Sequence, residues 1–184
     1  MEPAATKLDG PILIRPAVHG DARGFFVETY RRNVMGGLGI HDEFVQDNHS
    51  RSVRGVVRGI HFQLPPGQAK LVRCARGEIF DVIVDLRRDS PTFGQWEGHE
   101  LSDENGWQLY IPIGFGHGFC VVSDVADVIY KVSNYYDASI ERGIAWDDHD
   151  VGIEWPSGME WIVSERDAAA PTLASISHNL LFDS

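Results

Sequence analysis

The sequence of 184 residues predicts an all-β fold, an antiparallel β-sandwich or barrel of the jelly-roll type with a few short helices. Three observations predict this class. Two segments alternate apolar and polar residues with a period of two, many short apolar runs are separated by Gly, Pro, Asp and Asn clusters, and helical periodicity is weak. We expect residues 1–184 to form one domain, with a core at about 10–172 and a C-terminal tail at 173–184.

The clearest strands are expected at 80–86 and 126–132. Their alternating positions on one side are Phe80, Val82, Val84, Leu86, Ala126, Val128, Tyr130 and Val132, and on the other side Asp81, Ile83, Asp85, Asp127, Ile129 and Lys131. Because successive side chains of a strand point to opposite faces, each strand should have one face on a core. Further strands are expected in the apolar runs PILIRPAV, GFFVETY and LYIPIGFGHGFCVV.

Two short helices are expected. One covers about 28–38, after the first strands, and the other lies in the stretch SERDAAAPTL near the C-terminus. Ser164 can cap the second helix by accepting a backbone N–H. Pro171 should stop it, because proline cannot continue a helix.

The charge of the chain excludes a general nucleic-acid surface. Sixteen Lys and Arg stand against 27 Asp and Glu, a formal net charge of −11, whereas phosphate contacts need a basic face. The charge is uneven, because residues 51–76 contain six of the sixteen cations and no carboxylate. This segment could hold a small anion, or its arginines could be solvated edges of strands, and charge alone leaves both open.

Cysteine usage and hydropathy favour a protein from a reducing compartment with no membrane span. Cys74 and Cys120 lie in apolar runs without C-x-x-C spacing and are expected as small buried hydrophobic residues. The N-terminal stretch MEPAATKLDGP has no charged start followed by an apolar run, and the longest apolar runs are only a few residues. No signal peptide or membrane span is therefore expected.

A metal site is not expected. A metal-binding jelly roll typically carries H-x-H on one strand, so that both imidazoles point to the same side. Here the stretch GIHFQ has Gln63 where the second His would stand, and His117 stands alone in GFGHGF. No role is assigned to the histidines in loop-like or polar surroundings, which are His19, His41, His49, His99, His149 and His178.

The segments VQDN (45–48) and RGIHFQ (58–63) place polar residues where strands should be apolar. A period of two puts Arg58 on one face of its strand and Gly59, His61 and Gln63 on the other. One explanation is a polar cavity in which Gln46, Asn48, Arg58 and His61 hold a ligand. The other is a satisfied hydrogen-bond network without a ligand. Lys70, Tyr130 and His117, added to this cluster, favour a site.

The residue types of this cluster indicate proton transfer. The sequence has no recognisable nucleophile motif and no glycine-rich phosphate loop, which leaves the acid–base chemistry of His, Tyr and Lys. A His can take a proton from carbon if a carboxylate fixes its tautomer and a cation stabilises the developing oxyanion, while a Tyr returns the proton elsewhere. That combination is typical of an epimerase or isomerase acting next to a carbonyl.

Several long stretches, in order along about residues 10–172, resemble the dTDP-4-dehydrorhamnose 3,5-epimerases. They are GDARGFFVETY, FVQDNHSRS, VVRGIHFQLPPGQAKLVRCARGEIFDVIVDLRRDSPTFGQW, LYIPIGFGHGF, YKVSNYYD and GIAWDDHDVGIEWP. The resemblance implies a cupin-type jelly roll, a homodimer whose site is shared between subunits, and no metal or other cofactor. It also implies a dTDP-linked 4-keto-6-deoxyhexose substrate and a place in the cytoplasmic pathway that makes dTDP-L-rhamnose for cell-surface polysaccharide.

The resemblance also assigns roles to individual residues. His61 matches the general base, Asp167 the carboxylate that orients it, Tyr130 the acid on the opposite face of the sugar, and Lys70 the cation beside the C4 oxygen. Residues matching contacts to the nucleotide, in part from the partner subunit, are Arg23, Phe25 and Glu28. Residues matching other substrate contacts are Gln46, Asp47, Asn48, Arg58, His117, Tyr136 and Glu141. From pattern alone, Tyr130 could be a core tyrosine and Asp167 a helix-start carboxylate.

Two departures from the family and two alternative functions stay open. Arg166 stands where the family has Lys, which weakens its role as a substrate contact, and the chain continues past the usual end with ASISHNLLFDS. In this tail Leu180, Leu181 and Phe182 could cover a partner surface or be frayed. The alternatives are an epimerase that inverts only C3 or only C5, and a sugar-nucleotide-binding module without catalysis. The joint presence of a base and an acid argues against the second.

Overall fold

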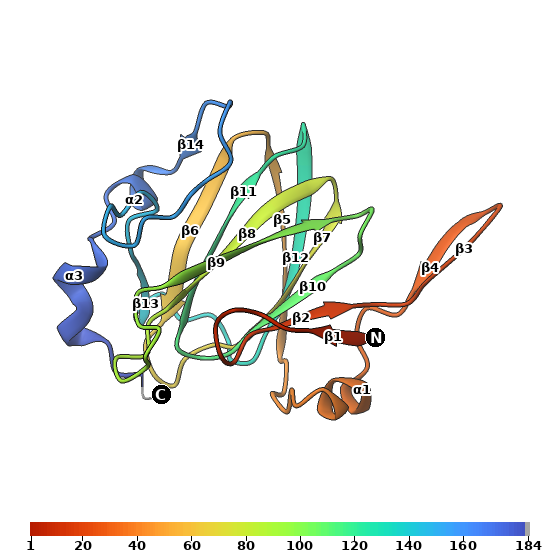
Figure 1. Cartoon of the computed structure of the whole chain (residues 1–184), viewed down its shortest axis with the longest axis horizontal. Helices are drawn as coiled ribbons and strands as arrows, with labels where there is room; N and C mark the ends of the chain where they lie inside the picture. The colour runs from red at the N-terminus through yellow and green to blue at the C-terminus, as the bar shows by residue number, and fades with distance from the viewer. Residues whose placement is uncertain (183–184) are drawn as a thin grey trace.

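A computed structural model describes residues 1–182, so residues 183–184 of the predicted tail lie outside the described residues. Two sheets face each other in a mainly antiparallel sandwich (Figure 1). The first has the strand order β1 (Glu2–Ala4), β2 (Ile12–Arg15), β10 (Gln108–Ile111), β7 (Lys70–Arg76), β12 (Val125–Val132), β5 (Gln46–Val53). The second has the order β13 (Glu141–Gly143), β6 (Val56–Gln63), β11 (Phe115–Val121), β8 (Glu78–Asp85), β9 (Trp96–Ser102), with β14 (Ile162–Val163) parallel to β6.

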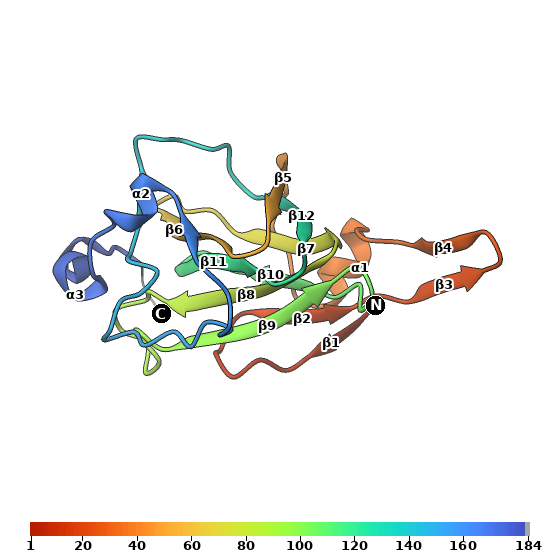
Figure 2. The same ribbon diagram turned by 90° about the horizontal axis from the view of Figure 1, so that it is seen from above.

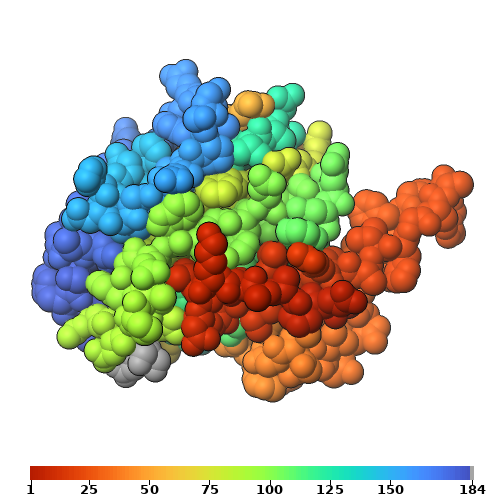
Figure 3. All heavy atoms as spheres, viewed as in Figure 1, coloured from red at the N-terminus to blue at the C-terminus, as the bar shows by residue number. Residues whose placement is uncertain are grey.

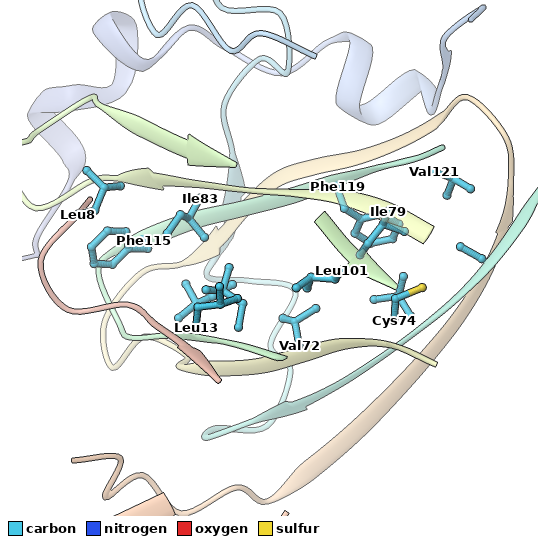
Figure 4. Packing of buried hydrophobic residues seen from close by; sticks show 14 residues of the cluster. Leu8, Leu13, Val72, Cys74, Ile79, Ile83, Leu101, Phe115, Phe119 and Val121 are labelled. Carbon is cyan, nitrogen blue, oxygen red and sulfur yellow. The ribbon is translucent and has the colours of Figure 1, made fainter. Parts of the chain in front are cut away.

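The predicted all-β jelly roll is confirmed. Its interior is a cluster of apolar side chains contributed by both sheets, among them Leu13 and Val72 from the first sheet and Ile83 and Leu101 from the second (Figure 4). Each of these four side chains is at least 95% buried. Burial of this kind is the main stabilising contribution to the fold, and it holds the two sheets at a fixed separation around the cavity described below.

The strand expected at 80–86 has both faces buried, not one. Val82 and Val84 pack in a second apolar cluster outside the sandwich, against segments from the C-terminal part of the chain. The other face points into the sandwich and carries Asp81 and Asp85, both fully buried. The alternation of apolar and polar residues looked like a core face and a solvent face, but here the polar positions line the interior. A buried carboxylate requires hydrogen-bond partners, and Asp85 has Arg87, Ser90 and Thr92.

Both predicted helices are confirmed, each shorter than its sequence window. The helix expected at about 28–38 is α1 (Arg32–Gly37). The second is α2 (Glu165–Ala168), where Ser164 Oγ accepts the backbone N–H of Asp167 at 3.1 Å as a cap. Two further elements follow in the tail, α3 (Leu173–Ile176) and the 3₁₀ helix η1 (Ser177–Asn179).

A two-stranded hairpin, β3 (Val18–Asp21) and β4 (Gly24–Val27), projects away from the sandwich (Figures 2 and 3). Its aromatic side chains lie in the open, with Phe25 68% and Phe26 71% exposed. Two adjacent exposed phenylalanines on a projecting hairpin are typical of a surface that meets another molecule.

The cysteines are buried free thiols, as predicted. Burial raises the pKa of Cys74 to about 12 and the pKa of Cys120 to about 11, so both stay protonated at neutral pH. Among the helices of residues 1–182, none has the length and apolar character needed to cross a membrane.

Candidate active site

A cavity of about 650 Å³ opens between the two sheets. Eleven residues singled out from the sequence line it, namely Gln46, Asn48, Arg58, His61, Lys70, His117, Tyr130, Tyr136, Glu141, Arg166 and Asp167. They come from strands of both sheets, from the loop after β12 and from α2, so residues more than 100 positions apart in the sequence share one site. A concave site with convergent polar and titratable groups is typical of small-molecule binding.

Arg58 and His61 both line this cavity, so the period-two assignment of opposite faces was wrong. The reason is a bulge in β6. His117 pairs with His61 and Phe119 pairs with Arg58, so β6 has one residue more than β11 between these pairs. The extra residue turns Arg58 to the side of His61. Gly59 makes this possible, because its φ is +124° and a Cβ there would lie 2.5 Å from the Cα of Gly118.

His61 and Asp167 form a close polar pair in the cavity. His61 Nε2 lies 2.6 Å from Asp167 Oδ1, and the side chain of Asp167 is 7% exposed. Burial alone would raise the pKa of Asp167, but its hydrogen bonds with His61 and with the backbone N–H of Gly59 outweigh burial and hold this pKa below its usual range. Asp167 is therefore an ionised acceptor, so Nε2–H of His61 donates and Nδ1 is left free to accept a proton.

Lys70 is a buried cation beside this pair. It opens β7, is 8% exposed, and its Nζ donates to the backbone oxygen of His61 at 3.3 Å. Burial lowers its pKa to about 8, against the opposing attraction of Glu141 and Asp81. A lysine that keeps its charge in a buried cavity is suited to stabilise negative charge that develops on a bound oxygen.

His117 forms a second, deeper pair with Asp81, whose role was missed from the sequence. His117 Nε2 lies 2.9 Å from Asp81 Oδ2, and both side chains are almost fully buried. Burial lowers the pKa of His117 below its usual range despite the nearby carboxylate, so the ring is neutral at pH 7. Alternation at 80–86 assigns Asp81 only to a polar face of its strand. The available sequence signal was a second acidic residue, Asp85, on that same face.

Tyr130 faces the cavity from the other sheet. It lies on β12, directly opposite Asn48 of β5, whereas His61 lies on β6 (Figure 1). Burial raises the pKa of Tyr130, and Glu141 raises it further. The phenol is therefore protonated at neutral pH and can act as a proton donor. Tyr130 also packs against the main apolar cluster, so the core-tyrosine interpretation and the site interpretation describe two sides of one ring.

The mouth of the cavity carries an ion-pair network. Glu141 accepts from Arg166 at 2.6 Å and from the Tyr136 hydroxyl at 2.8 Å, and Gln46 accepts the backbone N–H of Tyr136 at 3.0 Å. Arg58 donates its Nε to Ser52 at 2.9 Å and has no carboxylate partner in the part of the chain that the structure describes. Two arginines therefore present guanidinium groups at this mouth, where they could bind an anionic group.

Four of the residues singled out from the sequence lie away from the cavity. Asp47 points to the opposite face of β5 and binds Lys131 at 2.8 Å. Arg23 and Phe25 lie on or beside the projecting hairpin, and Glu28 follows it and pairs with Arg31. Within one chain the structure does not bring these four to His61.

Residues 1–182 contain no group of three or more His, Cys, Asp or Glu side chains arranged to hold a metal ion. Gln63, which stands where a second metal-binding His would be, is 4% exposed, and its amide makes no hydrogen bond within the described residues. Three of the unassigned histidines, His19, His49 and His99, lie on strands, and the Nε2 of His99 lies 3.2 Å from Glu97, a polar surrounding as expected.

The chain is similar to known proteins of one enzyme family. Residues 5–175 match the family described as dTDP-4-dehydrorhamnose 3,5-epimerase. An enzyme of that name from Shigella flexneri is 54% identical over 153 residues, 82% of this chain and 84% of the relative. A dTDP-4-dehydrorhamnose 3-epimerase from Streptomyces niveus is 45% identical over 169 residues, 91% of this chain and 81% of the relative.

Solved structures give the same result. The crystal structure of a dTDP-6-deoxy-D-glucose-3,5-epimerase from Legionella pneumophila, in complex with dTDP-4-keto-L-rhamnose, superposes with a TM-score of 0.96. Its sequence is 46% identical, and the match covers 100% of this chain and 98% of that chain. Together with the family match over most of the length, this shows that the chain belongs to the dTDP-4-dehydrorhamnose 3,5-epimerase family.

Proposed function

We propose that this chain is an isomerase that converts dTDP-4-keto-6-deoxy-D-glucose to dTDP-4-keto-L-rhamnose by inverting C3 and C5 of the sugar. The observation that carries the proposal is the His61–Asp167 pair on one side of the cavity, with Tyr130 on the facing sheet and Lys70 beside them. Membership of the 3,5-epimerase family supports the same reaction.

The positions of base and acid fit an inversion. The C4 ketone acidifies the hydrogens on C3 and C5, because the carbanion left by proton removal is an enolate. A sugar ring between the sheets has His61 on one face and Tyr130 on the other. His61 Nδ1 takes the proton from one face, and the Tyr130 hydroxyl returns a proton to the opposite face, which inverts the carbon.

Lys70 supports the step between these two transfers. Negative charge accumulates on the C4 oxygen as the proton leaves, and a buried ammonium group stabilises it more strongly than water would. Base, acid and oxyanion stabilisation all come from side chains of the chain, so the proposal requires no cofactor. Arg58 and Arg166 at the mouth are placed to bind the pyrophosphate of the nucleotide.

The proposal includes a homodimer with shared sites and a cytoplasmic location. The projecting hairpin supports the dimer, since Phe25 and Arg23 lie far from the cavity of their own chain and expose apolar and charged groups. In a two-fold dimer the hairpin of one subunit can reach the cavity of the other and cover the thymine with Phe25. The two free thiols support a reducing compartment.

A mixing experiment tests the shared site. A double variant, Arg23→Ala with Phe25→Ala, should lose affinity for the nucleotide, and His61→Ala should lose the base. When the two inactive variants are unfolded, mixed in equal amounts and refolded together, half of the dimers are mixed and each has one complete site. Activity should recover to about a quarter of wild type. No recovery, although the mixed dimers form, would show that each hairpin serves its own chain.

Isotope exchange tests the reaction itself. We expect incubation with dTDP-4-keto-6-deoxy-D-glucose in deuterated water to place deuterium at both C3 and C5, as read by NMR of the sugar. Label at a single carbon would identify an epimerase of that carbon only, the activity named for the Streptomyces niveus relative. If no deuterium is incorporated although the protein still binds the nucleotide, the chain would be a sugar-nucleotide-binding module without catalysis.

A further inference from the structure

The end of the chain packs behind the candidate base. The family match stops at residue 175, yet residues 176–182, here named the C-terminal strap, are not frayed. Leu180 is 1% and Phe182 is 5% exposed, whereas Leu181 between them is 65% exposed. The strap continues from α3, which lies beside α2 on the side of the second sheet (Figure 1). The sequence left open whether this tail covers a partner surface, and its two buried residues pack on their own chain.

The strap contacts the residues on either side of His61. Leu180 and Phe182 belong to the apolar cluster that contains Ile60 and Phe62. The rings of Phe62 and Phe182 meet edge to face with centroids 6.0 Å apart. Ile60 and Phe62 are the chain neighbours of His61 and point to the opposite face of β6, so their packing fixes the backbone from which His61 reaches the cavity.

A second cavity, of about 280 Å³, lies between the strap and the pair. His61 and Asp167 border it on one side, and Ile176, Asn179 and Leu180 on the other. Asp167 is followed by Ala169 and Ala170, which also line this space. The strap therefore lines one wall of an open pocket on the far side of the hydrogen bond from the active-site cavity.

We propose that the C-terminal strap positions the His61–Asp167 pair for proton transfer, with Leu180 as its main positioning residue. The inference rests on the proposed function. Truncating Leu180 would enlarge a pocket that borders both partners of a 2.6 Å hydrogen bond and would remove part of the apolar cluster that contains Ile60 and Phe62. Leu180 does not line the active-site cavity, so substrate binding should be unaffected while the reactive geometry loosens.

The test compares three leucines. Leu180→Ala should lower kcat about 10-fold, with KM and the dTDP Kd unchanged within about 2-fold, because small misplacements of a catalytic group cost up to about 100-fold. Leu181→Ala changes the neighbouring exposed residue and should behave as wild type. Leu13→Ala removes a buried leucine from the other cluster and should lower Tm without lowering kcat at a temperature where all variants are folded. Leu180→Met should restore activity, and Leu180→Val replaces Leu180→Ala if the latter does not fold.

Nuclear magnetic resonance can monitor the His61–Asp167 hydrogen bond independently of enzymatic activity. The imidazole N–H proton of His61, identified by its loss in His61→Asn, should shift in Leu180→Ala and stay in place in Leu181→Ala. Unchanged kcat and resonance in Leu180→Ala would overturn the proposal, as would an equal loss of kcat in Leu13→Ala. If wild type shows no exchange at carbon, the proposed function fails, and the resonance still decides whether the strap positions the pair.

Discussion

Replacing His61 with alanine should lower kcat about 10²- to 10⁴-fold, the range expected for loss of a general base. The reaction begins with removal of a hydrogen from carbon, and His61 lines the cavity with a free ring nitrogen and the ionised Asp167 carboxylate bonded to its other nitrogen. Since the proposed pyrophosphate contacts, Arg58 and Arg166, are unchanged, dTDP should bind to the variant within about 2-fold of wild type, because the lost group is proposed to act on the sugar alone.

The measurement pairs steady-state kinetics with calorimetric titration of dTDP. His61→Asn is the informative companion, because an amide can still donate to Asp167 but cannot take a proton. Both variants should be equally inactive. His149→Ala, which changes a fully exposed histidine, should leave kcat and affinity as they are. Substantial turnover by the asparagine variant would mean that His61 only holds Asp167 in place and that the base is another residue.

The fold could be predicted from the sequence because strands and turns are specified locally. Alternation at 126–132 and glycine-rich breaks define strands without knowledge of their partners, and Ser164 defines the start of α2 in the same way. Tertiary position is what this pattern cannot supply. Asp81 alternates with apolar residues as a solvent-facing residue would, but the second sheet turns that face inward and buries it.

The resemblance to the family could identify the candidate site residues together, whereas the residue pattern alone assigns some of them to opposite faces of a strand. The geometry of β6 explains this difference. Arg58 and His61 fall on opposite faces by counting, and the bulge at Gly59 is what unites them. An isolated glycine within a strand was the available signal for that bulge. No local pattern places Asp167 against His61, because the contact spans 106 positions and depends on the chain returning past β6 through α2. The packing of Leu180 depends on the same return.

Replacing Lys70 with methionine should lower kcat about 10²- to 10³-fold, the loss found when one oxyanion-stabilising group is removed. The same substitution should make the protein more stable. A lowering of the Lys70 pKa from 10.5 to about 8 corresponds to about 3 kcal/mol of unfavourable folding free energy at neutral pH, which a buried thioether does not carry. Opposite changes in kcat and Tm distinguish a buried cation kept for function from one kept for structure.

The lowered pKa of Lys70 predicts how both kcat and Tm depend on pH. Lys70 must be protonated to stabilise the enolate, so wild-type kcat should fall as the pH rises above about 8, and this alkaline limb should be absent in Lys70→Met. The pKa of Lys70 is lower in the folded protein than in the unfolded chain. The unfavourable contribution of Lys70 to folding stability is therefore complete below about pH 8 and disappears as the pH approaches 10.5. The Tm advantage of Lys70→Met should therefore narrow between these values, whereas Lys7→Met, which changes an exposed lysine, should show neither effect.

An unchanged kcat with a raised KM in Lys70→Met would make Lys70 a binding residue, because the enolate would then form equally well without it.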